Sequence, residues 1–152
     1  MTRPHVVIIG SGFGGLFAAQ ALAKAPVDVT LVSRTASHLF QPLLYQVATG
    51  ILSTGEIAPA TRDILAKQEN ATVLLSEVTS INLTSRVVVA EKLAKTTVLK
   101  YDHLIVAAGA GQSYFGNDQF ATFDHGMMTI DDALELRSSI FGALEMAELT
   151  ES

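Results

Sequence analysis

The feature that most constrains the fold of this chain is a glycine-rich turn near its start. The run Gly10-Ser11-Gly12-Phe13-Gly14-Gly15 follows the short apolar stretch His5–Ile9. Apolar residues then recur with helical spacing over Phe13–Lys24, and a second apolar stretch occupies Val27–Val32. This order of strand, glycine turn, helix and strand predicts a βαβ unit of about thirty residues, whose two strands are parallel.

The positions of the glycines match a turn that holds a dinucleotide. Gly10 permits a tight turn, Gly12 lets the backbone approach a pyrophosphate, and Gly15 allows the helix to pack closely on the strand. The first N–H groups of the helix, with the helix dipole behind them, then face the phosphates. Within a βαβ unit this pattern favours a dinucleotide site, and a plain structural turn is the alternative.

The rest of the pattern predicts an α/β fold with a parallel sheet and a β-meander. Six further features are expected from the sequence: an irregular segment over Thr35–Gly50; a helix over Glu56–Gln68; a strand over Thr72–Leu75 and Val78–Leu83, interrupted near Ser76-Glu77; a hairpin of Arg86–Ala90 and Thr97–Tyr101; a buried strand over His103–Ala108; and a helix to about Glu148, opened by a capping box at Thr129–Asp132.

Composition excludes several classes of function. Apolar residues make up 49% of the chain, as a buried parallel sheet requires, and the net charge of −5 without a basic cluster argues against nucleic-acid binding. There are no cysteines, so disulfides, thiolate metal sites and thiol nucleophiles are excluded, and the histidine spacing suggests no metal site. No signal peptide and no run of 18 apolar residues is present, which predicts a soluble cytoplasmic domain.

The end of the second predicted strand departs from the dinucleotide pattern. An Asp or Glu about 20 residues past the glycine turn usually bonds the ribose hydroxyls, but Ser33 stands there and Arg34 follows. A hydroxyl beside a guanidinium would suit the 2′-phosphate of NADP. A neutral replacement that weakens binding is the alternative, and the sequence alone does not choose between them.

Several segments together resemble a known family. With the glycine turn, they are similar to the N-terminal part of type II (non-proton-pumping) NADH:quinone dehydrogenases of actinobacterial type. The segments that carry this resemblance are His38–Gly50, Tyr101–Gly109, Ser113–Asp118 and Thr129–Arg137.

The resemblance implies an incomplete Rossmann-like domain that binds FAD, with no catalytic side chain in this part. Gly10, Gly12, Phe13, Gly14 and Gly15 would face the FAD pyrophosphate. Ser33 and Arg34 would lie at the ribose, where the family normally has an acid. The other implied FAD contacts are Gln41 and Pro42 towards the flavin, Val78 at the adenine by its backbone, and Ala108 with Gly109 closing over the cofactor.

The resemblance also implies a division of the chain and a fragment. Residues 1–128 would form the FAD-binding domain, and 129–152 a helix leading to an NADH-binding domain that is absent. The quinone site and the membrane-attachment region would be absent too, although the family is peripheral on the cytoplasmic face of the cell membrane. We therefore expect an unpaired sheet edge, an uncovered apolar face on the last helix (Ala133, Leu134, Phe141, Leu144 and Ala147), and no NADH:quinone turnover by this chain alone.

Two other classes of function remain open at this point. A non-catalytic remnant or interaction module would keep the fold without the chemistry. A small NADP-dependent reductase of the short-chain type needs a Tyr-x-x-x-Lys pair, and none of Tyr45, Tyr101 and Tyr114 has a lysine four residues on. His38 is expected to fix its loop, and we assign no role to His5, His103 or His125.

Overall fold

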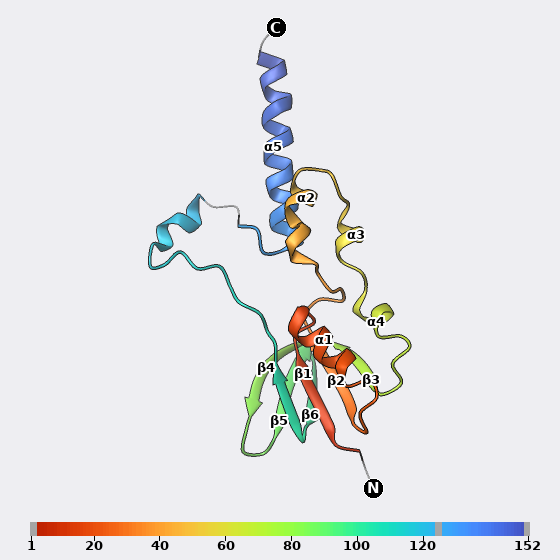
Figure 1. The fold of residues 1–152 in the computed structure, drawn as a ribbon. Coiled ribbons are helices and arrows are strands. Elements are labelled where there is room, and N and C mark those ends of the chain that lie inside the picture. Colours follow the sequence, from red (N-terminus) through yellow and green to blue (C-terminus); the bar gives the residue numbers. More distant parts are fainter. Residues whose placement is uncertain (1–2, 124–125, 151–152) are drawn as a thin grey trace. The chain divides into compact units, whose positions relative to one another are not determined.

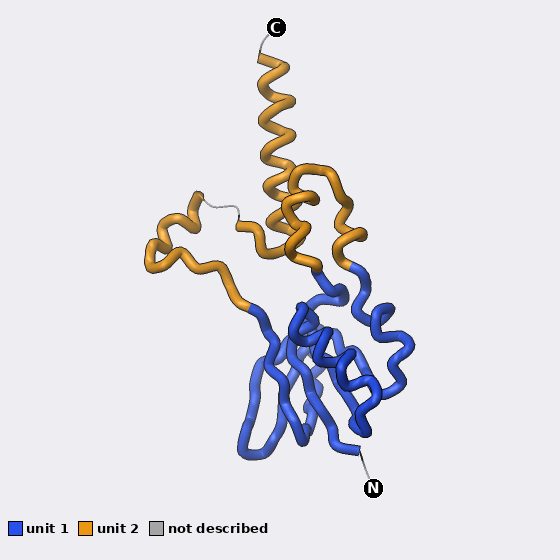
Figure 2. The backbone as a smooth tube through the Cα atoms, viewed as in Figure 1, with its two compact units in different colours: residues 1–39, 59–109 blue, residues 40–58, 110–152 orange. Residues whose placement is uncertain are grey.

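The computed structural model describes residues 3–123 and 126–150, so His125 lies outside the described residues. The chain forms two compact units, coloured separately in Figure 2. The first consists of residues 1–39 and 59–109, and the second of residues 40–58 and 110–152.

A parallel sheet of four strands forms the centre of the first unit (Figure 1). Its strands are β1 (His5–Ile9), β2 (Asp28–Ser33), β3 (Ala71–Leu75) and β7 (His103–Val106), in the order β3-β2-β1-β7. All three pairings are parallel, which confirms the predicted α/β fold. β1 therefore lies between β2 and β7 and is buried on both faces, as its unbroken apolar sequence requires. The prediction of a buried strand over His103–Ala108 is wrong in burial and length, because β7 ends at Val106 and pairs on one side only, and His103 and Val106 are exposed.

The two faces of β1 contact different partners. Val6 and Ile8 belong to a core cluster with Leu16 and Ala19 of α1 (Phe13–Ala21). Val7 and Ile9 point the other way, as alternate residues of a strand must. They pack in a second cluster with Val32, Val88, Ala90 and Tyr101.

The second cluster includes residues of an antiparallel sheet made of β4 (Glu77–Asn82), β5 (Val87–Lys92) and β6 (Lys95–Lys100). This is the predicted meander, and the β5–β6 hairpin is confirmed. Its two-residue turn, Leu93-Ala94, has φ of 48° and 61°, the conformation of a type I′ turn.

The prediction that β3 and β4 form one interrupted strand is wrong. β3 pairs parallel with β2, whereas β4 pairs antiparallel with β5 in the other sheet. The chain changes sheets at Ser76, which is buried and donates its N–H to the carbonyl of Ser33 at 2.9 Å.

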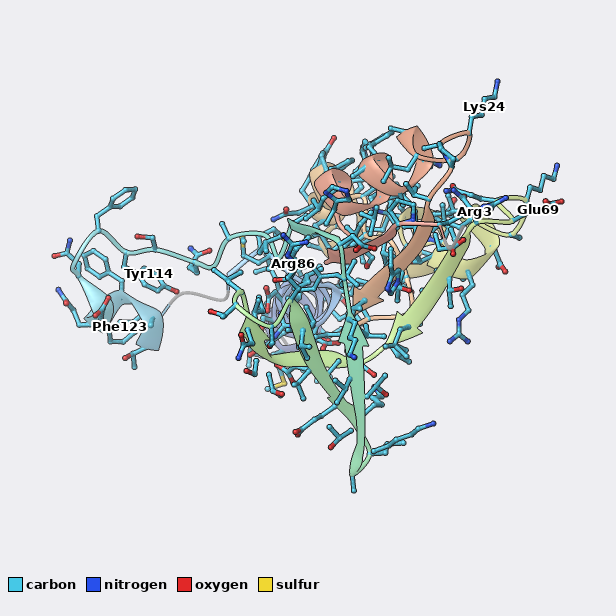
Figure 3. All side chains as sticks on the ribbon, turned by 90° about the horizontal axis from the view of Figure 1, so that it is seen from below. Arg3, Lys24, Glu69, Arg86, Tyr114 and Phe123 are labelled. Atoms are coloured by element: carbon cyan, nitrogen blue, oxygen red, sulfur yellow. The ribbon has the colours of Figure 1, made fainter. Side chains whose placement is uncertain are left out.

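Helix α1 ends at Ala21, three residues before the predicted Lys24. Two side chains from beyond α4 take up the carbonyls near this end. Gln68 Nε2 donates to the Ala19 carbonyl at 2.8 Å, and Asn70 Nδ2 donates to that of Leu22 at 3.0 Å. The chain therefore turns early towards β2, and the side chains of Lys24 and Glu69 extend outwards where β2 and β3 begin (Figure 3).

The prediction of a single helix over Glu56–Gln68 is wrong. Two short helices occupy this region, α3 (Thr54–Ile57) and α4 (Thr61–Ile64), and they belong to different units. Ala58 between them has φ −134° and ψ 61°, because a residue before proline is driven out of the helical region by Pro59.

The second unit is mainly helical. The segment predicted to be irregular contains η1 (Gln41–Leu43) and α2 (Leu44–Ala48), and η2 (Asp118–Thr122) follows later. α2 packs against the long helix α5 (Ile130–Thr150).

The predicted capping box at the start of α5 is confirmed. Asp132 accepts the N–H of Thr129 at 2.9 Å, and the Thr129 hydroxyl accepts the N–H of Asp132 at 3.1 Å. The prediction of an uncovered face is wrong for Ala133, which is fully buried. Leu134, Phe141, Leu144 and Ala147 are exposed as expected.

Candidate functional site

The glycine turn after β1 is held between two other backbone segments. Gly10 has φ +103°, which L side chains rarely adopt, and its N–H donates to the Val32 carbonyl at 2.8 Å. A Cβ on Gly10 would lie 2.1 Å from the carbonyl oxygen of Ala107, just beyond β7. A Cβ on Gly15 would lie 1.8 Å from the carbonyl oxygen of Gly10. The close approach of backbone atoms is therefore enough to require glycine at both positions, whether or not a ligand binds.

Gly12 differs from Gly10 and Gly15, because a Cβ on Gly12 would meet no atom within 4 Å. Gly12 is also the N-cap of α1 and has no side chain with which to cap it. The first intrahelical bond runs from the N–H of Leu16 to the Gly12 carbonyl at 3.0 Å. The first N–H groups of a helix are not used by its own hydrogen bonds, so a helix start of this kind suits an anion.

A cavity of about 470 Å³ lies next to the turn, entirely within the first unit. It lies at the carboxyl ends of the parallel strands, where β1 has β2 on one side and β7 on the other. Ligands of open α/β sheets bind at this kind of switch point. Its lining includes seven of the residues predicted from the sequence: Gly10, Gly12, Ser33, Arg34, Val78, Ala108 and Gly109.

The other predicted residues lie elsewhere. Gly14 has the Ala107 side chain 3.5 Å from where a Cβ would be, and Gly15 is buried beneath the turn. Phe13 stacks on Phe17, with ring centroids 6.3 Å apart. Gln41 and Pro42 belong to η1 of the second unit, where Gln41 Nε2 lies 3.3 Å from Met128 Sδ.

Ser33 is turned into the protein. It is buried, and its Oγ lies 2.7 Å from Oγ of Ser11 in the glycine turn. The Thr35 N–H donates to the same oxygen at 3.3 Å. This hydroxyl ties the end of β2 to the turn, a role that the sequence pattern did not indicate.

His38 is also buried and fixes the turn. Its Nδ1 lies 2.8 Å from the carbonyl oxygen of Ser11, and its ring meets the Phe13 ring edge-on with centroids 5.2 Å apart. Both contacts join the segment after β2 to the start of α1.

The charged side chains of the cavity lining are Arg34 and Glu77. Arg34 Nη1 lies 3.8 Å from Glu77 Oε1, and both side chains are largely exposed. Sequence reasoning missed Glu77 as a site residue. The interruption near Ser76-Glu77 was its one local signal, because it marks the point where the chain leaves the parallel sheet.

Comparison with known proteins shows the family of the chain. The family model described as pyridine nucleotide-disulphide oxidoreductase matches residues 4–143. This chain is a member of that family.

Within the pyridine nucleotide-disulphide oxidoreductases, the chain is similar to two curated proteins of Mycobacterium tuberculosis. It is 66% identical over 148 residues to the type II NADH:quinone oxidoreductase NdhA, and 64% identical over 146 residues to Ndh. These matches cover 97% and 96% of this chain but 32% of each relative. The chain thus spans about a third of the length of the curated relatives that it matches.

The chain also shares its fold with a solved structure. NDH2 of Plasmodium falciparum in complex with NADH superposes with a TM-score of 0.85 at 27% identity, over 96% of this chain and 30% of that one. Over the described ranges 3–123 and 126–150, no helix has the length and apolar character needed to cross a membrane. Nor do three His, Asp or Glu side chains gather there as a metal site would need.

Proposed function

We propose that this chain binds FAD and forms the flavin-binding part of a type II NADH:quinone oxidoreductase. The observation that carries the proposal is the glycine turn at the edge of a cavity at the switch point of the sheet, in a chain 66% identical to such an enzyme. We also propose the division expected from the sequence, with FAD bound by residues 1–128 and the helix of 129–152 leading towards the rest of the enzyme.

The described residues fit such a cofactor. A Cβ on Gly12 would meet nothing within 4 Å, so the backbone at the N-cap of α1 is open to the cavity that it lines. In the proposal, the N–H groups at this helix end hold the pyrophosphate, the backbone of Val78 contacts the adenine, and Ala108 with Gly109 closes over the cofactor. Gln41 and Pro42 are proposed to contact the flavin end.

Bound FAD supplies the redox chemistry, because a flavin accepts a hydride from NADH and passes electrons to a quinone. The chain's own residues bind and orient the cofactor. Because the chain covers about a third of its relatives, we propose that these 152 residues alone bind FAD weakly and give no turnover. For the whole enzyme we propose a place on the cytoplasmic face of the membrane, with NADH and quinone as its substrates.

Binding of FAD to the purified chain tests the proposal. Titration followed by quenching of flavin fluorescence should give saturable binding, and Gly12→Ala should weaken it about tenfold or more by blocking a charged hydrogen bond. The matched control is Gly55→Ala in α3, where a Cβ also meets nothing within 4 Å.

Three outcomes would contradict the proposal. A chain that binds no FAD and stays colourless would favour a remnant or interaction module. NADP binding without flavin affinity would favour the reductase suggested by Arg34. Oxidation of NADH with a quinone at ordinary enzymatic rates would overturn the expectation that the 152 residues lack turnover.

A further inference from the structure

The cavity beside the glycine turn has one carboxylate in its lining, and it is not at the usual ribose-binding position. That position, at the end of β2, holds Ser33. The carboxylate belongs to Glu77, the first residue of β4. A ribose diol is normally held by an acid at this end of the sheet, so Ser33 and Glu77 are the two candidate residues for it.

Ser33 is poorly placed to bind a ribose. Its side chain is buried, and its one hydroxyl is already shared with Ser11 at 2.7 Å and with the N–H of Thr35 at 3.3 Å. A serine side chain offers one oxygen, whereas a carboxylate offers two acceptor oxygens, one for each of the two hydroxyls of a ribose. Turning Ser33 towards a ligand would break the bond that ties β2 to the glycine turn.

Glu77 is held over the same end of the sheet. Ser33 pairs in register with Leu75, and the next residue, Ser76, donates its N–H to the Ser33 carbonyl at 2.9 Å. Glu77, the residue after Ser76, pairs in register with Glu91 of β5. Its backbone is therefore fixed, while its side chain is 63% exposed and can turn towards a ligand.

Arg34 lies beside this carboxylate at the cavity. Arg34 Nη1 is 3.8 Å from Glu77 Oε1, and Arg34 follows Ser33 directly in the chain. An exposed ion pair of this kind is weak, so it does not withhold the carboxylate from a ligand. The neighbour of Glu77 is Val78, which also lines the cavity.

We propose that Glu77 binds the 2′- and 3′-hydroxyls of the adenosine ribose of FAD, in place of an acid at the end of β2. The carboxylate then comes from the start of β4 and not from the end of β2, and it stands beside the residue proposed for the adenine. This inference rests on the proposed function, and it makes Glu77 a residue that determines affinity for the adenosine half of the cofactor.

Calorimetric titration with ADP, 2′-deoxy-ADP and 3′-deoxy-ADP tests the inference on the full 152-residue chain. The unchanged chain should bind ADP about tenfold more tightly than an analogue that lacks a bonded hydroxyl, since hydrogen bonds to charged groups are the strong ones. Glu77→Gln and Glu77→Ala should bring this ratio close to one and should weaken FAD about tenfold. Glu91→Gln, on the paired strand and outside the cavity lining, is the matched control and should keep both values.

The outcomes separate this inference from the proposed function. If the Glu77 variants keep the ratio of the unchanged chain, Glu77 does not bind the ribose, even though FAD still binds. If they weaken ADP and both analogues equally, Glu77 acts only on the fold or the local charge, and the inference is again overturned. Failure of the unchanged chain to bind either FAD or ADP overturns the proposed function together with the inference.

Discussion

Gly15→Ala should destabilise the chain by about 3 kcal/mol, at the upper end of the range for overpacked sites. The added Cβ would lie 1.8 Å from the Gly10 carbonyl oxygen and 2.9 Å from its carbon. Both atoms are backbone and cannot rotate away, so α1 must retreat from β1 by more than an ångström. Leu16 and Ala19 on α1 would leave their places in the core against Val6 and Ile8.

The effect is measurable by urea unfolding followed by circular dichroism, extrapolated linearly to water. A loss of about 3 kcal/mol also lowers the melting temperature by about 6–12 °C for a chain of this size. The matched control is Gly14→Ala in the same helical turn, where the new Cβ meets only the Ala107 side chain at 3.5 Å. Alanine favours a helix over glycine, so this control should be stabilised by about 0.5–1 kcal/mol.

The reasoning would be refuted if Gly15→Ala unfolded within about 0.5 kcal/mol of the unchanged chain. Equal destabilisation by Gly14→Ala would refute it as well. In that case the glycines would serve the flexibility of the turn, and close backbone packing would not explain Gly15.

Three local features should each have a measurable effect on stability. The N–H groups of Met128 and Thr129 lower the pKa of Asp132 below its ordinary value of 3.8. The Asp132 carboxylate therefore stabilises α5 fully above pH 3.8, and this stabilisation is lost as the pH falls through the lowered pKa. A pH titration of helical ellipticity should show the loss, and the Asp132→Asn variant should not show it. Ala94→Gly should raise the free energy of unfolding by about 1 kcal/mol in urea titrations, because alanine at φ 61° is strained. Ser11→Ala and Ser33→Ala should each lower the free energy of unfolding by about 1 kcal/mol. In a double-mutant cycle, the sum of the two losses should exceed the loss in the double variant, since both substitutions break the same hydrogen bond.

Local signals in the sequence predicted much of the fold. The strand His5–Ile9, the glycine turn and the capping box at Thr129 each depend on neighbouring residues, and the structure has all three as predicted. The prediction of one helix over Glu56–Gln68 was wrong because it treated Pro59 as tolerated in a first helical turn, whereas Pro59 drives Ala58 out of the helical region.

The remaining differences depend on residues far apart in the chain. The change of sheet at Ser76 requires β3 to pair with β2 while β4 pairs with β5, and no local pattern specifies those partners. The contacts of the candidate site also join residues that are distant in the sequence. Ser33 is bonded to Ser11, 22 residues earlier, and Glu77 lies near Arg34 only because β2 and β3 are neighbours in the sheet.

The position of β1 between β2 and β7 has a consequence for synthesis on the ribosome. β2 follows β1 after a single helix, but β7 begins at His103, close to a hundred residues after His5. At translation rates of about 5–20 residues per second, β1 waits roughly 5–20 s for its second neighbour. During that interval one edge of the most apolar strand has no partner, so a nascent chain is most exposed to aggregation before β7 emerges, and slower translation of the meander would prolong that exposure.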